Sequence, residues 1–168
     1  MVDLTRDTVW QTMASTNFMV VGMVTARGEA RTAGVMHAVH DGRVWFTTSS
    51  ADWKTRHLTA HPQVSVTVAI PKRVWFLPWI RIPAATITFS GAAEPTPVAD
   101  LAPDVAHALL HGLEFGDEAA QGITAFAVRP RGDFVTYGVG VSAMGMRDTE
   151  RARGRVASST APAAAIIA

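Results

Sequence analysis

A run of four hydroxyl residues followed by a lysine is the part of this 168-residue chain best suited to binding chemistry. The run is Thr47, Thr48, Ser49 and Ser50, and the lysine is Lys54. Small hydroxyl donors beside a fixed positive charge at a helix start favour an anion, above all a phosphate group. The alternative is that Lys54 is a solvated helix residue and that the threonines reflect only the preference of threonine for strands.

The segments around this run predict a hairpin followed by a short helix. Residues Ala30 to His40 and Arg43 to Thr48 have strand character, and Asp41-Gly42 between them is typical of a tight turn. Asp52 can cap a helix from about Trp53 to Ala60, with the lysine in its first turn. Because successive strand side chains point to opposite faces, only one of the two threonines can face a ligand, although both backbone amides can contribute.

The remaining pattern predicts a mainly β protein with flanking helices. A short amphipathic helix is expected over Leu4 to Ala14, and another over Val98 to Leu113 with an interruption at Pro103. Further strands are expected over Asn17 to Thr25, Gln63 to Ile70, Ala84 to Glu94, Ile123 to Val128 and Phe134 to Val141.

Glycine and proline mark the expected irregularities of these strands. Gly91 is a candidate bulge, and Pro95 with Pro97 should end the strand that contains it. Residues Arg129 to Asp133 should separate the last two strands. Residues 1–150 are expected to form one domain, and residues 151–168 a flexible tail, because their pattern dissolves into Ala, Ser, Gly and Arg.

Composition excludes several classes of function. The net charge of +1 gives no basic field for nucleic acid or an anionic membrane, so any bound anion should be small. The absence of cysteine excludes disulfides, thiolate metal ligands and a cysteine nucleophile, so redox chemistry would need a cofactor. No secretory signal or membrane-spanning segment is recognisable, and a cytoplasmic location is expected.

The stretch GEARTAGVMHAVHDGRVWFTTSSADWKTRHLTAHPQVSVTV is similar to the pattern of the flavin-binding split-barrel superfamily, which includes pyridoxamine 5'-phosphate oxidases and flavin- or deazaflavin-dependent reductases. The resemblance covers roughly Asn17 to Tyr137. It implies a six- or seven-stranded antiparallel split β-barrel with flanking helices. It also implies a homodimer that holds FMN or coenzyme F-420 between its subunits.

The resemblance also implies which residues hold the cofactor. The backbone from Gly34 through Val35 and Met36 to His37 would lie along the ring system, and His37 could hydrogen-bond it. Lys54 would pair with the phosphate. Further contacts to the phosphate or ribityl chain are expected from Thr47, Thr48, Ser49 and, unless it is only a solvated hairpin residue, Arg31.

Two departures from the pyridoxamine 5'-phosphate oxidases bear on the activity. Trp53 stands where those enzymes usually have a basic residue, and the carboxyl-terminal region lacks their arginine-rich substrate segment. The hypothesis is therefore an oxidoreductase that transfers hydride to a small apolar or conjugated substrate, with no catalytic residue assigned. A rival hypothesis is a non-catalytic cofactor- or haem-binding protein with His37 or His111 as an axial ligand.

Two other features have more than one interpretation. His107 and His111 have the spacing of a metal site on one helix face, but no third ligand is evident, so an exposed helix is the simpler account and no metal is expected. The apolar segment Val74 to Ile80 either packs at a dimer interface or covers the substrate as a lid.

Overall fold

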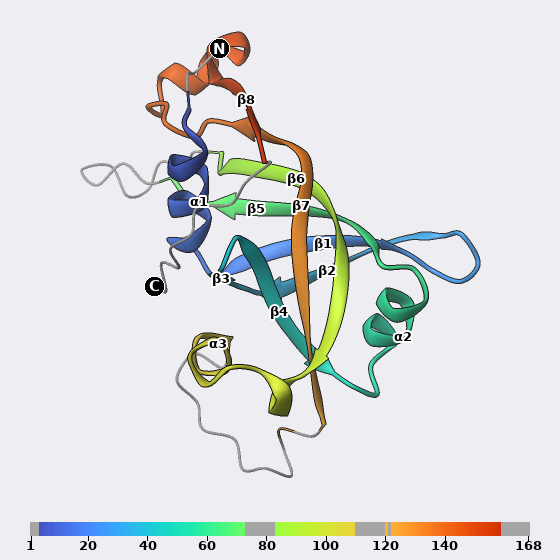
Figure 1. Cartoon of the computed structure of the whole chain (residues 1–168). Helices are drawn as coiled ribbons and strands as arrows, with labels where there is room; N and C mark the ends of the chain where they lie inside the picture. Colours follow the sequence, from blue (N-terminus) through green and yellow to red (C-terminus); the bar gives the residue numbers. More distant parts are fainter. Residues whose placement is uncertain (1–3, 73–82, 110–119, 121, 159–168) are drawn as a thin grey trace.

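The computed structural model describes residues 4–72, 83–109, 120 and 122–158 (Figure 1). The strands and helices succeed one another along the chain in nearly the predicted order. The strands are β1 (Phe18–Val24), β2 (Ala30–Met36), β3 (Ala38–His40), β4 (Arg43–Ser49), β5 (Gln63–Ile70), β6 (Ala85–Pro97), β7 (Ile123–Tyr137) and β8 (Arg153–Ala157). The helices are α1 (Arg6–Ala14), α2 (Trp53–Ala60), η1 (Val98–Asp100), α3 (Pro103–Leu109), η2 (Gly145–Arg147) and α5 (Thr149–Ala152).

The strands form one curled antiparallel sheet in the order β2-β1-β5-β6-β7-β4-β3, with β8 paired to β7. Helices α1 and α2 lie on opposite sides of this half-barrel (Figure 1). The expectation of a mainly β split barrel with flanking helices is confirmed. None of the described helices is long and apolar enough to cross a membrane.

The predicted strand from Ala30 to His40 is divided at His37. Its first part, β2, pairs with β1, and its second part, β3, pairs with β4, so the two ends of the sheet are one residue apart in the chain. The amide of His37 donates to the carbonyl of Asn17 at 2.9 Å. The turn at Asp41 and Gly42 has positive φ at both residues, as the tight hairpin requires.

The barrel interior is filled by alternate residues of the strands and by α1. Phe46 and Phe126 stack with ring centroids 5.4 Å apart, and Trp10 of α1 meets Phe134 edge to face at 5.3 Å. A second apolar cluster lies under α3, on the other face of β4 and β7, and comprises Trp45, Val98, Val105, Leu109, Ala125 and Ala127. The strand β4 is therefore covered on both faces along most of its length.

Two expected strand ends are wrong because pairing overrides local signals. Strand β6 continues through Pro95 and Pro97, since its pairing with β5 stops at Ala92, opposite the first residue of β5, and the prolines need to pair only with β7. Strand β7 likewise runs unbroken through the expected interruption at residues 129–133, with Pro130 opposite Gly91.

The bulge lies on β7 rather than at Gly91. One residue of β6, between Thr88 and Ser90, faces three residues of β7, which include Gly132 with φ of +73°. Gly91 has a different role, because a Cβ there would lie 2.7 Å from the carbonyl oxygen of Arg129. The glycine permits the close approach of two backbones.

The predicted helix between Val98 and Leu113 is interrupted at the expected place, since η1 ends before α3 begins at Pro103. Residues 110–113 lie outside the described part. The expected flexible tail is wrong for residues 151–157, because they complete α5 and form β8 against β7. Residues 159–168 lie outside the described part. Every second residue of β8 packs inward. This alternation covers only five residues and includes a glycine, so the sequence alone does not identify a strand here without knowledge of its pairing with β7.

Candidate functional site

Lys54 lies in the first turn of α2, directly after the end of β4, as predicted. Its ammonium group forms an ion pair with the carboxylate of Asp52, which also caps the helix by accepting from the Lys54 amide at 3.1 Å. The hydroxyl of Thr48 donates to the same carboxylate at 3.5 Å. The hydrogen bonds from Lys54 hold the pKa of Asp52 below its ordinary value. Asp52 is therefore the resident counter-ion of the lysine at neutral pH.

The two threonines of the hydroxyl run face opposite sides of β4. Thr48 points to the interior with only 7% of its surface exposed, whereas Thr47 lies half-buried on the outer face. Ser49 is exposed, and its carbonyl accepts a bond of 2.7 Å from the Thr55 hydroxyl. Thr48 is thus the member of the run that joins Lys54, and Ser49 anchors the helix to the strand.

The residues expected along a ring system lie on β2 and alternate between its faces. Gly34 and Met36 are exposed on the outer face, while Val35 packs against the core. The ring of Phe18 lies over Gly34, where a Cβ would come within 2.9 Å of it. The space directly above Gly34 is therefore occupied by the Phe18 ring, and the two together form part of an exposed outer face of β1 and β2.

His37 does not share this exposed face, and its expected hydrogen bond to a ring system disagrees with the structure. The side chain is 2% exposed, and Nε2 lies 3.1 Å from the carbonyl oxygen of Met13 in α1. The ring enters the core because the chain passes from β2 to β3 at this residue. His37 connects the first helix to the barrel in this structure.

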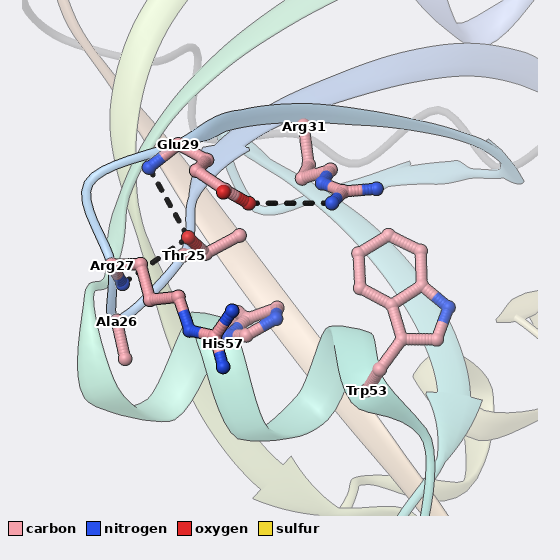
Figure 2. Close-up of a pocket in the computed structure, with 7 residues that line it drawn as sticks. All are labelled: Thr25, Ala26, Arg27, Glu29, Arg31, Trp53 and His57. Atoms are coloured by element: carbon pink, nitrogen blue, oxygen red, sulfur yellow. Dashed lines mark hydrogen bonds and ion pairs between the residues drawn. The ribbon is translucent and has the colours of Figure 1, made fainter.

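A pocket of about 450 Å³ opens between the β1–β2 hairpin and α2 (Figure 2). Arg31, a predicted site residue, lines it, and its guanidinium pairs with Glu29 at 3.3 Å. Figure 2 shows the indole of Trp53 pointing toward Arg31, and Arg27 and His57 also line the pocket. Thr25 and Ala26 complete the lining. The pocket adjoins the lysine site, because Lys54 Nζ lies 5.3 Å from the centre of the Trp53 ring.

Sequence reasoning missed most of this pocket. Trp53 and His57 are four residues apart on α2 and their rings meet at 5.8 Å, so helical spacing was a usable signal. Nothing local indicated that the hairpin carrying Arg27 would fold toward that helix. Asp52 was predicted as a cap, but its pairing with Lys54 follows from the helix-start geometry.

The remaining candidates are not gathered at this site. His107 is exposed on α3, whereas His111 and the segment from Val74 to Ile80 lie outside the described residues. His40 is half-buried, with Nε2 3.8 Å from the Asp104 carboxylate. In the described part of the chain, no group of three or more histidine, aspartate or glutamate residues could hold a metal ion.

No known protein-family profile matches the sequence, and no curated protein matches it. Solved structures do match. A haem-binding protein from Mycobacterium smegmatis has a TM-score of 0.64 at 16% identity over 94% of this chain, which spans 60% of that protein's length.

Two further structures extend the likeness to redox proteins. An F-420 reductase has a TM-score of 0.53 at 16% identity, covering 77% of this chain and 95% of the reductase. A candidate pyridoxamine 5'-phosphate oxidase from Listeria innocua has a TM-score of 0.57 at 13% identity, covering 74% and 92%. Identities this low establish the fold alone. The chain therefore has the split-barrel fold that these reductase-like, oxidase-like and haem-binding proteins share.

Proposed function

We propose that this protein is an oxidoreductase that binds FMN or coenzyme F-420 and transfers hydride to a small apolar or conjugated substrate. The observation that carries the proposal is the junction of β4 and α2, where Lys54 and Thr48 both bond to Asp52 near an open pocket lined by Arg31. The split-barrel neighbours whose names refer to F-420 reduction and pyridoxamine 5'-phosphate oxidation support it.

The residues of the chain would anchor and orient the cofactor, which supplies the hydride chemistry when bound. The phosphate monoester of FMN carries nearly two negative charges at neutral pH and can replace the single charge of Asp52 at Lys54. Thr48 would then donate to the phosphate instead of to Asp52. The exposed face of β2 around Gly34, together with the Phe18 ring that lies over it, offers a surface for a planar ring.

The proposal includes a homodimer. The outer face of β1 and β2 exposes large apolar side chains, namely Phe18 at 48%, Met36 at 51% and Val24 at 42%. A second copy of the chain would remove this apolar surface from water and enclose a ring bound at β2. Light scattering after size exclusion tests this, and a monomer at micromolar concentration, with or without cofactor, would contradict it.

The test of the phosphate anchor compares ligands with and without phosphate. Calorimetric titration of the cofactor-free protein should give tighter binding of FMN than of riboflavin. Lys54→Gln should weaken FMN binding at least about tenfold, since a charge-assisted hydrogen bond is lost, and leave riboflavin binding unchanged. Arg56→Gln removes a charge from an exposed position of the same helix and should change neither.

The oxidoreductase step needs its own measurement. The reduced cofactor, bound to the protein, should be reoxidised faster by a quinone than the free cofactor is, as followed by absorbance without oxygen. Equal rates with and without the protein would contradict the proposed reaction while leaving cofactor binding intact.

Haem binding is the second candidate, because the Mycobacterium smegmatis haem-binding protein shares the fold. His37 is the candidate axial ligand in the described part of the chain, and its Nε2 already faces the Met13 carbonyl. Haem ligation there would require that contact to break. A Soret band on haemin titration that disappears in His37→Ala would favour this candidate over the first.

A further inference from the structure

The pocket between the β1–β2 hairpin and α2 combines one aromatic surface with two guanidinium groups. Trp53 is 37% exposed, and its indole borders the pocket opposite the hairpin (Figure 2). Arg31 is paired with Glu29, whereas in the described part of the chain the guanidinium of Arg27 forms no ion pair. An aromatic face with nearby arginines suits a flat ring that carries phosphate.

The pocket and the proposed phosphate anchor share one neighbour, because Trp53 lines the pocket and its ring lies beside Lys54. The ammonium group of Lys54 lies 5.3 Å from the centre of the Trp53 ring. A group joined directly to a phosphate bound at Lys54 would therefore reach the indole. A second phosphate attached to the first would approach Arg31 or Arg27 on the hairpin side. The bound molecule can therefore extend from the lysine into the pocket.

Glu29 narrows the choice of ligand. Its carboxylate lines the same pocket and would repel each carboxylate of an acidic tail, whereas a dinucleotide brings only one further phosphate, which two arginines can offset. Glu29 can also accept hydrogen bonds from ribose hydroxyls or a ring amino group. A flexible acidic chain would also make no use of the indole face. We infer that this pocket holds the adenylate half of a dinucleotide form of the flavin, with the adenine on Trp53 and the second phosphate at the arginines. The inference rests on the proposed function.

The experiment compares FAD, FMN and coenzyme F-420 as ligands of the cofactor-free protein by calorimetric titration. FAD should bind at least about tenfold more tightly than FMN, since stacking of one base on an aromatic side chain contributes about that much. Trp53→Leu should remove most of this advantage and leave the affinity for FMN unchanged. Trp53→Phe keeps an aromatic face and should retain the preference.

Other outcomes separate this inference from the function on which it rests. Equal affinities for FAD and FMN, or an equal loss of both in Trp53→Leu, would overturn the adenylate site while the phosphate anchor stands. Binding of coenzyme F-420 with no binding of FAD would overturn it in favour of an acidic tail. Binding of none of the three would overturn the proposed function and the adenylate site together.

Discussion

The two helices on opposite sides of the barrel, α1 and α2, have similar lengths and the same kind of start, yet they are embedded very differently. Each begins with a side-chain cap, from Thr5 in α1 and Asp52 in α2. Helix α1 buries four residues, including Trp10 and Met13, whereas α2 buries only Leu58. The first helix thus completes the core, and the second leaves its polar and aromatic side chains free for binding.

The largest expected effect is the loss of core packing under α1. Trp10→Ala removes a side chain that is 5% exposed and in contact with Phe134, and should lower the free energy of unfolding by about 3–5 kcal/mol. Urea unfolding followed by circular dichroism measures this change. Trp53→Ala, at the exposed indole of α2, should stay within about 1 kcal/mol of the native protein. Similar losses in the two variants would contradict the contrast between the helices.

A smaller effect is expected at His37, where the barrel meets α1. His37→Ala loses a buried contact to the Met13 carbonyl and leaves a small cavity, so a loss of about 1–3 kcal/mol is expected. Flavin affinity should change less than about twofold. His57 lines the pocket proposed for the adenylate, so His57→Ala should weaken FAD binding and have little effect on stability. A large loss of FMN affinity in His37→Ala would contradict this assignment and indicate that His37 belongs to the cofactor site.

The cap of α2 allows charge and capping to be separated. Asp52→Ala loses the bond to the Lys54 amide and should destabilise the protein by about 1 kcal/mol, whereas Asp52→Asn keeps a capping oxygen and should lose less. Both variants free the ammonium of Lys54 and should strengthen FMN binding severalfold. Weaker FMN binding in Asp52→Asn would show that Asp52 assists the ligand instead of competing with it.

The smallest effect is the dependence of stability on pH. Because the pKa of Asp52 is lower in the folded protein than its ordinary value of 3.8, folding favours the ionised carboxylate. Its contribution is complete above that value and is lost as the pH falls through the lowered pKa. The stability difference between the native protein and Asp52→Asn should therefore be constant above about pH 5 and shrink below about pH 4. A difference that grows on acidification would contradict the assignment.

Local signals predicted the parts of the fold that depend on neighbouring residues. The alternation of Val64, Val66 and Val68 identified β5, and Asp52 correctly identified the start of α2. The turn at Asp41-Gly42 was also correct. The unbroken course of β7 through Pro130 was not predictable, because the partner that keeps it extended is β6, some forty residues earlier.

The candidate site likewise has one part that local sequence predicts and one part that it does not. The position of Lys54 after β4 follows from a strand, a turn and a cap that lie together in the sequence. The pocket depends on how the hairpin carrying Arg27 and Arg31 is placed against Trp53, which only the closed barrel determines. His37 was misjudged for a related reason, since the division between β2 and β3 that turns its ring inward arises from pairing with two different strands.

The short strand β8 bears on how the protein should be handled. Its residues Arg153 to Ala157 pair with Asp133 to Tyr137 of β7, and Ser158 adds two bonds to the Gly132 carbonyl, at 2.9 Å from its amide and 2.7 Å from its hydroxyl. A shortened version ending before Arg153 would leave that row of amides and carbonyls without strand partners, ready to accept an extended segment from another molecule. Such a truncation would invite aggregation, so expression trials should retain the chain through Ser158.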